Sequence, residues 1–318
     1  MRKCILLSNE YLLPPAWRFM LGGPIWAFNP GILKNDDHWI LAYRIVGVDQ
    51  MRRIGMCRLD KHYRIIEGSQ VAFSDLIVVS TADNRASFRR WFADPRLYRL
   101  AGRSFLYWNS GWHEPKNFQY LQEFDPDKFT PIGQVREMVL DGPRQPLEKN
   151  WSLFGNGPFY AVYSIVPHRI LEFTIDGDSF IEFKDAVSVD WSAQQYCAEY
   201  GKLRGGAPPI RIGDIYYSFC HSLYSLDEGL CYTPTVYCFS SAYSFRPVRA
   251  PQGTLKLGNP FGSSTVQKRL NPVVAEVLYP CGAEYLDGHF IVSHGINDEH
   301  CAISILPEED ITSLLANL

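Results

Sequence analysis

Phe92-Ala93-Asp94-Pro95-Arg96-Leu97 is the stretch that decides the fold, because it places one acid and one base directly in front of a hairpin. It continues through Tyr98-Arg99-Leu100, a turn at Ala101-Gly102 and a second aromatic-rich stretch at 103–107. Apolar and aromatic runs on both sides of a Gly turn are typical of paired β-strands. The start of a strand is a place where a rigid sheet can hold a catalytic side chain.

The same order of polar start, strand, turn and second strand occurs five times along the 318 residues. The units begin near Phe28, Phe92, Glu148, Gly205 and Pro280. Each unit continues into an outer strand with alternating apolar residues. These outer strands are expected at 54–60, 118–125, 169–176, 235–239 and 301–306.

Three or four strands per unit, repeated at intervals of about 60 residues, are typical of β-propeller blades. We therefore predict an all-β fold: a five-bladed β-propeller that forms a single domain over residues 1–318, with the active site in the central channel where the inner strands begin. The units lack the Trp-Asp signature of the shorter WD40 repeats, which disfavours a pure protein scaffold. One helix is expected, in the tail from Glu308 to Leu318.

The composition excludes several classes of protein. With 46% hydrophobic and 20% charged residues, the chain can bury a sizeable core and is not expected to be disordered. The formal net charge of -3 indicates no basic surface for nucleic acid, with a local patch around Arg85, Arg89 and Arg90 as the alternative. No apolar run approaches the roughly 20 residues needed to span a bilayer. We expect a soluble, cytoplasmic protein.

The eight cysteines show neither C-x-x-C pairs nor zinc-type spacing, and several lie within apolar strand patterns. We interpret them as small buried residues in a reducing compartment. Pairs of His or carboxylate residues at metal-ligand spacing are also missing. We therefore expect no metal and no cofactor, and the sequence leaves the oligomeric state open.

Asp94 is the leading candidate for a catalytic residue. Pro95 is expected to keep it extended, and an ion pair with Arg96, itself a candidate substrate-binding residue, would keep the carboxylate charged. Burial in the channel would instead raise the pKa of Asp94 toward that of a general acid. A salt-bridged strand start without a catalytic role is the alternative interpretation.

Other polar residues stand at or near the strand ends. Lys149 could hold a phosphate or a sugar hydroxyl, and Trp151 offers a ring on which a pyranose could stack. His221 could face the channel, and Asp298 would be a second carboxylate able to bind sugar hydroxyls. A solvated Lys, a buried structural His and a plain turn at 297–298 are the alternatives.

Taken in order, these motifs resemble the five-bladed propeller enzymes of glycoside hydrolase family 130, the β-mannoside phosphorylases and hydrolases, and related propeller mannosyltransferases. The resemblance covers nearly the whole chain, from about Asn29 to Asp298. The motifs that carry it are Asn29-Pro30-Gly31, Tyr43-Arg44, Asp94-Pro95-Arg96, Glu148-Lys149-Asn150-Trp151, Pro167-His168, Gly205-Gly206-Ala207-Pro208, Cys220-His221-Ser222 and Ser293-His294-Gly295-Ile296-Asn297-Asp298.

The resemblance implies roles for the matching positions. Asp94 matches the general acid that protonates the glycosidic oxygen, by way of a sugar hydroxyl in the phosphorylases. The positions that bind the reacting sugar are matched by Asn29, Arg44 and Asp298. Those near the attacking phosphate, a co-substrate, are matched by Lys149 and His221.

This chain departs from the family pattern at two points. Ala93 stands where the family usually has Glu before the acid, so the electrostatics around Asp94 must differ. The family's Arg-Asn phosphate pair is missing, and Arg144 is only a stand-in because no Asn follows it.

Three functions follow as hypotheses. The first is an inverting glycoside phosphorylase or hydrolase that acts on a mannoside-like bond in an oligosaccharide or glycoside. The second is a glycosyltransferase that uses a sugar nucleotide or sugar phosphate, with Asp94 as the base. The third is a carbohydrate-binding propeller without catalysis. The sequence does not distinguish the sugar, the linkage or the acceptor.

Overall fold

The computed structural model describes residues 3–80, 91–111, 117–145, 147–177, 179–227, 229–261, 270–272 and 274–318. These residues form mainly β-strands with a few short helices, so the predicted all-β class is confirmed. The possible basic patch at Arg85, Arg89 and Arg90 lies outside the described residues. Within the described ranges, no helix is long and apolar enough to cross a membrane.

The strands pair into three hydrogen-bonded sheets. The first contains β2 (Trp26–Asn35), β3 (His38–Val46) and β4 (Arg52–Leu59), which pair as antiparallel neighbours in that order.

The second sheet contains two antiparallel groups, whose outermost strands β8 and β12 pair in parallel. The strands of one group are β5 (Ala93–Leu100), β6 (Arg103–Asn109), β7 (Gln119–Asp125) and β8 (Thr130–Leu140). The strands of the other are β9 (Ser152–Gly155), β10 (Phe159–Ser164), β11 (His168–Phe173) and β12 (Phe180–Val189).

The third sheet also joins two groups through one parallel pair, between β16 and β18. The strands around β16 are β13 (Lys202–Arg204), β14 (Ile210–Ile212), β15 (Ile215–Leu226), β16 (Gly229–Ser240), β17 (Pro247–Pro251) and β21 (Leu315–Asn317). The strands around β18 are β18 (Val274–Leu286), β19 (His289–Ile296), β20 (His300–Pro307) and the N-terminal β1 (Lys3–Leu7).

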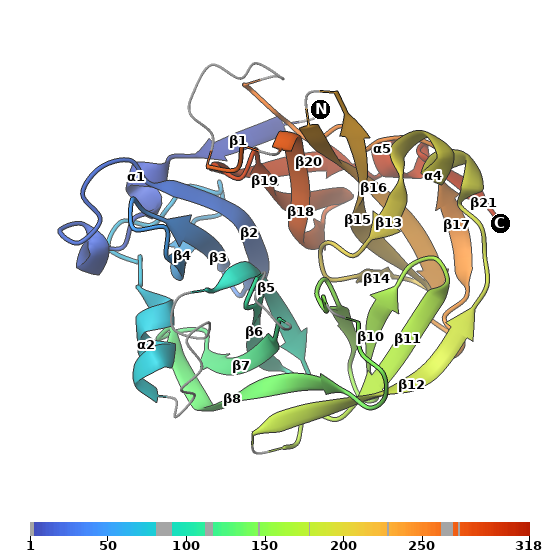
Figure 1. Ribbon diagram of the computed structural model, residues 1–318, viewed down its shortest axis with the longest axis horizontal. Helices are drawn as coiled ribbons and strands as arrows, with labels where there is room; N and C mark the ends of the chain where they lie inside the picture. The colour runs from blue at the N-terminus through green and yellow to red at the C-terminus, as the bar shows by residue number, and fades with distance from the viewer. Residues whose placement is uncertain are drawn as a thin grey trace.

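Figure 1 shows these groups of strands following one another in chain order around a common centre. Each pair of neighbouring groups encloses its own cluster of buried apolar side chains. One cluster joins Tyr43 and Ile45 of β3 to Ile291 of β19 and Ile303 of β20, so the last group packs against the first. The hydrophobic core is therefore divided among the interfaces around the centre.

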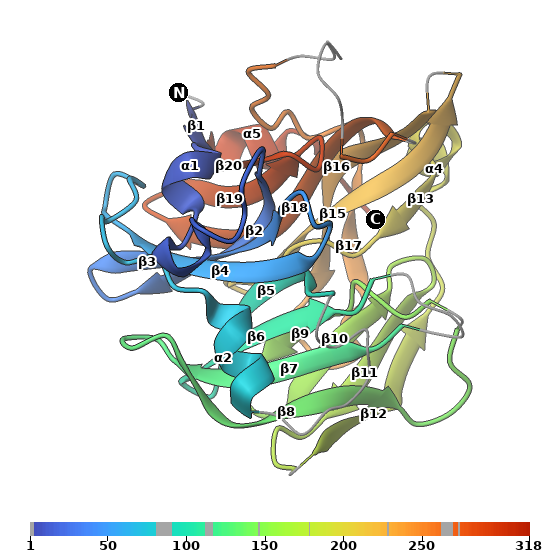
Figure 2. The same cartoon turned by 60° about the vertical axis from the view of Figure 1, so that its left-hand side comes forward.

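Short helices lie outside the strands. They are α1 (Asn9–Leu12), the 3₁₀ helix η1 (Pro15–Trp17), α2 (Phe73–Ser80), α4 (Gln194–Tyr200) and α5 (Glu308–Thr312). The helix α2, which contacts β4 and β8, was missed because its Ile and Val residues favour strands. Figure 2 shows it on the outer side of these strands. Phe73 and Ile77, four residues apart, are both buried, which explains the helix.

The predicted tail helix is wrong beyond Thr312. After α5, Leu315–Asn317 form β21, which pairs with β17. The amide of Leu318 donates to the Val248 carbonyl at 3.0 Å. Pairing with an open strand edge therefore replaces the helical hydrogen bonds that the spacing of the leucines had favoured.

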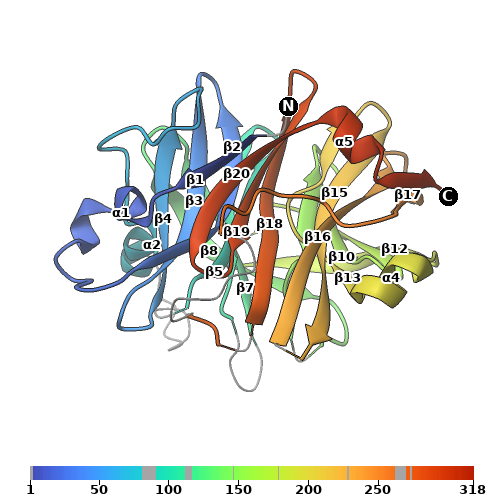
Figure 3. The same cartoon turned by 90° about the horizontal axis from the view of Figure 1, so that it is seen from above.

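The N-terminal strand completes the last group of strands. Figure 3 shows β1 lying along β20, and the two strands pair from Lys3 with Ile305 to Leu7 with Cys301. Leu7 is 4% exposed and belongs to the cluster between the first and last groups, whereas Leu6 is 41% exposed. The N-terminal strand is thus joined to the last group by strand pairing and to the cluster by Leu7 and the partly buried Ile5.

We expect Leu7→Ala to lower the free energy of unfolding by about 2–4 kcal/mol, because it leaves a cavity in that cluster. Leu6→Ala is the matched control and should cost no more than about 0.5 kcal/mol, as for other surface substitutions. Urea denaturation of both variants measures the difference. Equal losses would show that β1 is not packed as described.

Candidate active site

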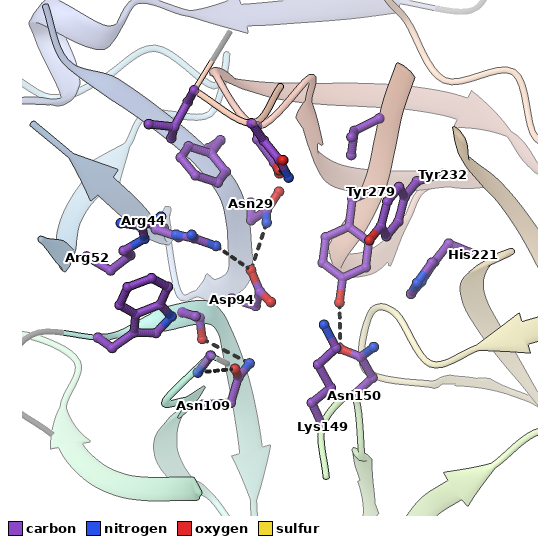
Figure 4. A pocket seen from close by; sticks show the side chains of 18 residues that line it. Asn29, Arg44, Arg52, Asp94, Asn109, Lys149, Asn150, His221, Tyr232 and Tyr279 are labelled. Atoms are coloured by element: carbon purple, nitrogen blue, oxygen red, sulfur yellow. Dashed lines mark hydrogen bonds and ion pairs between the residues drawn. The ribbon is translucent and has the colours of Figure 1, made fainter. Parts of the chain in front are cut away.

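A cavity of about 270 Å³ lies where the innermost strands begin. It is lined by residues from every group of strands around the centre. Figure 4 shows Asn29, Arg44 and Asp94 on one side of this cavity, and Lys149, Asn150 and His221 on the other. The lining residues are Phe28, Asn29, Arg44, Arg52, Trp91, Ala93, Asp94, Asn109, Gly111, Lys149, Asn150, His221, Tyr232, Leu270, Asn271, Val277, Tyr279 and Asp298.

The backbone turns the same way at several of these strand starts. Asn29, Asp94 and Asn150 have φ angles of 53°, 52° and 67°, in the left-handed region that Asn and Asp tolerate better than other side chains. The strand register shifts beside Asn29, between Phe28 and Gly31, and at Asp94, between Ala93 and Arg96. The extended conformation predicted for Asp94 is therefore wrong, because a bulge overrides the effect of the following proline.

Asp94 has two direct partners. Its Oδ1 accepts a hydrogen bond of 2.8 Å from Asn29 Nδ2 and lies 3.2 Å from Arg44 Nη1. The carboxylate therefore pairs with Arg44, not with the neighbouring Arg96 as predicted. A Cβ at Gly295 would come within 2.0 Å of Asn29 Oδ1, so a glycine there is required for Asn29 to approach β19.

The two carboxylates of the cavity have opposite pKa shifts. Burial alone would raise the pKa of Asp94, but Arg44, Lys149, the Asn29 amide and Arg96 together lower it. Burial raises the pKa of Asp298, and the charge of Asp94 adds to the rise against the effects of Arg44 and Asn271. In the free protein Asp94 is thus the more acidic group, contrary to the raised pKa that burial suggested.

The turn between β19 and β20 places Asp298 in the cavity wall. Asn297 and Asp298 both have positive φ angles, 56° and 57°, and the Glu299 backbone N–H donates to the Ile296 carbonyl at 3.0 Å, as in a type I′ turn. Asp298 Oδ2 accepts a hydrogen bond of 3.2 Å from Asn271 Nδ2. The sequence analysis treated a plain turn at 297–298 and a carboxylate facing the channel as alternatives. In the structure residues 297–298 form a turn, and Asp298 also lines the cavity.

The side of the cavity across from Asp94 is cationic. Burial and the nearby Arg204 and Arg44 lower the pKa of Lys149, whereas Asp94 raises it. Burial, Lys149 and Arg204 lower the pKa of His221 well below its usual value, so this ring is neutral. A neutral imidazole beside a lysine can donate a hydrogen bond from its ring N–H to a bound anion.

Arg96 and Trp151 do not line this cavity. Arg96 is 0% exposed and donates to the Trp151 carbonyl (3.0 Å), Asn150 Oδ1 (3.0 Å) and the Tyr279 hydroxyl (2.9 Å). Trp151 is 1% exposed, and its ring packs 5.4 Å from that of Tyr163 and 5.1 Å from that of Phe183. Arg96 is a structural link, and the Trp151 ring has no open face for stacking on a sugar in this structure.

Several cavity residues were not found from the sequence. The Arg52 guanidinium lies 3.8 Å from the centre of the Trp91 ring, and burial lowers the pKa of Arg52 to about 10, so it stays protonated near neutral pH. Arg52 stands at the start of the outer strand β4, where the repeated motif gave no signal. Tyr279, by contrast, directly precedes the predicted unit start at Pro280.

Other sequence candidates lie away from the cavity. His168 and His294 are fully buried, with Nε2 atoms 3.2 Å from the Tyr237 hydroxyl and 2.9 Å from Ser304 Oγ, as expected for structural histidines. Arg144, the stand-in for a phosphate ligand, donates to the Asn117 carbonyl at 2.8 Å and does not line the cavity. All eight cysteines are free, and six of them are buried. Among the described residues no group of three metal-ligating side chains comes together.

We expect Arg44→Gln to raise the pKa of Asp94, because Arg44 is the strongest of the groups that lower it. The carboxyl carbon of Asp94, followed by NMR during a pH titration, measures the shift. Arg58→Gln, an arginine of β4 outside the cavity, is the control and should leave the titration unchanged. An unchanged pKa in Arg44→Gln would contradict the ion pair.

Comparisons with known proteins support the fold. A β-1,2-mannobiose phosphorylase from Listeria innocua, in complex with β-1,2-mannobiose, has a TM-score of 0.59 and 12% identity over 98% of each chain. A glycosyl hydrolase from Bacteroides ovatus has a TM-score of 0.57 and 12% identity over 89% of this chain and 85% of that one. A mannose phosphorylase from Leishmania mexicana, in complex with phosphate ion, has a TM-score of 0.50 and 10% identity over 94% and 88%.

No model of a known protein family matches the sequence, and no curated protein matches it either. At identities of 10–12%, the structural matches concern the fold. The chain therefore has the fold of the mannoside phosphorylases and glycoside hydrolases to which its motifs show a resemblance.

Proposed function

We propose that this protein is an enzyme that cleaves the glycosidic bond of mannoside-like substrates with inversion, with inorganic phosphate as the attacking group. The main observation is the polarity of the cavity: Asp94 lies on one side, and Lys149 and the neutral His221 lie on the other. The fold supports the proposal, because the Listeria innocua protein is a β-1,2-mannobiose phosphorylase and the Leishmania mexicana protein is a mannose phosphorylase.

We also propose that the groups of strands are the blades of one five-bladed propeller domain covering residues 1–318. Each group is antiparallel within itself, and residues of its strands or directly beside them line the cavity. Apolar clusters lie between successive groups, and one of them joins β19 and β20 of the last group to β3 of the first, so the groups form a closed ring. Such an arrangement places the strand starts around one channel.

In the proposed reaction, Asn29, Arg44 and Asp298 bind hydroxyls of the reacting sugar. Asp94 donates a proton to the leaving oxygen, by way of a sugar hydroxyl, as the bond from that oxygen to the anomeric carbon breaks. A phosphate oxygen, held by Lys149 and His221, attacks the anomeric carbon from the opposite face. The products are a sugar 1-phosphate of inverted configuration and the free alcohol, and Asp94 regains its proton from water.

Because its pKa is lowered, Asp94 is ionised in the free protein. It must therefore gain the proton that it donates after the substrate and phosphate have bound. A bound phosphate carries negative charge, which offsets Arg44 and Lys149, the two side chains that contribute most to lowering this pKa. Phosphate binding therefore raises the pKa of Asp94 and favours its acid form. Lys149, which holds the phosphate, therefore also influences when Asp94 is protonated.

Hydrolysis is the second candidate, and one observation favours it. An inverting hydrolase needs a second carboxylate to activate water, and the raised pKa of Asp298 suits a general base. The cavity has three cations, Arg44, Arg52 and Lys149, against two carboxylates, so phosphate remains the first candidate. Assays with and without phosphate separate the two reactions.

We expect Asp94→Asn to lower kcat on a β-mannoside by about 10²–10⁴-fold, because general acid catalysis contributes a factor of this size. The KM for the glycoside should change little. Asp185→Asn, a surface carboxylate paired with Arg169, is the matched control and should keep the activity of the unmodified enzyme. Retention of activity within tenfold by Asp94→Asn would contradict its assignment as the acid.

Anion binding should also be accompanied by proton uptake. Sulfate, which does not titrate near neutral pH, can replace phosphate in calorimetry at about pH 5, in two buffers with different heats of ionisation. We expect more uptake in the unmodified protein than in Asp94→Asn, because the anion raises the lowered pKa of Asp94 as well as that of Asp298, and only Asp298 is left in the variant. Equal uptake by both proteins would mean that another group takes the proton.

A further inference from the structure

A second cavity lies farther along the same inner strands that line the catalytic one. Its volume is about 440 Å³, and no described residue lines both cavities. The catalytic cavity is lined by Asn29, Asp94, Asn150 and Tyr279, and the second cavity by the residues four positions later, Leu33, Tyr98, Phe154 and Ala283. At the rise of a strand, four residues place the two cavities about 13 Å apart. We call the second one the distal cavity.

The inner strands meet between the two cavities. A Cβ atom at Gly282 of β18 would lie 2.4 Å from the Ile32 amide nitrogen of β2, so these two backbones are in contact. Arg96 and Trp151 stand between the lining residues of the two cavities along the chain, and they are 0% and 1% exposed. A ligand in the distal cavity therefore binds apart from the glycoside, and its binding does not depend on the proposed reaction.

Two side chains of opposite charge bind the backbone of Lys34 at this cavity. Glu284 Oε1 accepts a hydrogen bond of 3.1 Å from the Lys34 amide, and Arg99 Nη2 donates one of 3.2 Å to the Lys34 carbonyl. The N–H and C=O of one strand residue point to the same side of the strand. The carboxylate and the guanidinium thus lie on one side of β2, at a spacing that a single residue sets.

These two charges do not form an ion pair with each other. In the part of the chain that the structure describes, neither Glu284 nor Arg99 has an ion-pair partner. Burial raises the pKa of Glu284 to about 7, against the opposing effects of the Lys34 amide, Arg99 and the Lys34 side chain. The carboxylate therefore lacks a cation in direct contact, and the guanidinium lacks an anion.

The wall of the distal cavity is mainly apolar. Buried leucine and aromatic side chains from three of its strands line it: Leu33, Leu97, Leu153 and Phe154. An apolar pocket of this size with a few placed polar groups is typical of sites for small organic molecules. A ligand that fits the charges and the wall carries a cation, an anion and an apolar group.

We propose that the distal cavity binds a free α-amino acid with an apolar side chain, with its ammonium group at Glu284, its carboxylate at Arg99 and its side chain on the apolar wall. In an α-amino acid both charged groups are attached within one residue. Their spacing therefore matches that of a carboxylate and a guanidinium that bind the N–H and the C=O of one residue. The binding involves no covalent step.

Calorimetric titration with L-phenylalanine, 3-phenylpropionate and phenethylamine tests this assignment. 3-Phenylpropionate lacks the ammonium group and phenethylamine lacks the carboxylate, but both keep the ring. We expect phenylalanine to bind at least about tenfold more tightly than either analogue, because each analogue leaves one charged side chain without its partner. L-Leucine, 4-methylpentanoate and 3-methylbutylamine form a second series with a smaller apolar group.

Variants of the two charged residues locate the binding. Glu284→Gln keeps an acceptor for the Lys34 amide but removes the charge, so it should weaken binding of the amino acid at least about tenfold and leave binding of the carboxylic acid unchanged. Arg99→Gln should weaken the binding of both. Glu182→Gln, which removes a surface acid paired with Lys184, is the matched control and should bind the amino acid as the unmodified protein does.

The inference is wrong if neither amino acid binds, or if an analogue binds as tightly as the amino acid from which it derives. It is also wrong if Glu284→Gln binds the amino acid with unchanged affinity. Tighter binding of 3-phenylpropionate than of phenylalanine would show that the distal cavity is a site for organic acids, with no role for the Glu284 charge.

Discussion

A buried guanidinium at the centre of the molecule links the fold to the chemistry. Arg96 donates hydrogen bonds to Asn150, Trp151 and Tyr279, and so joins β5 to the start of β9 and to β18. All three acceptors are neutral, so the desolvation of this charge is not offset by an ion pair. Its charge contributes instead to lowering the pKa of Asp94, two residues earlier in the same strand.

The site therefore depends on a balance of charge more than on any single side chain. Arg44, Arg96 and Lys149 keep Asp94 ionised while the cavity contains only protein groups. The left-handed backbone at Asn29, Asp94 and Asn150 brings these groups together, and such conformations cost free energy that the surrounding sheets must supply. An anionic reactant changes the balance, which connects binding to the protonation of the acid.

The sequence predicted the strand class, the repeated strand starts and the place of Asp94, because these depend on local patterns of apolar residues and turns. It was wrong about Arg96, for a physical reason. Strict alternation would put residues 94 and 96 on the same face, but the bulge between Ala93 and Arg96 breaks the alternation. Trp151 was assigned to a sugar for its residue type, and its burial depends on Phe183, which is distant in the sequence.

Arg52, Arg99 and Glu284 could not have been predicted as site residues. They belong to β4, β5 and β18, and only the closure of the sheets around one centre brings them together with the other residues of their cavities. Charged residues on strands are common at surfaces, so a single one gives no signal of function. Their meaning comes from the cavities that they line.

The most direct test of this account is proton NMR of β-mannobiose with the purified protein, in the presence and absence of inorganic phosphate. The account predicts that α-mannose 1-phosphate and free mannose appear only when phosphate is present. Release of free mannose alone, at a rate independent of phosphate, would contradict phosphorolysis and identify water as the attacking group.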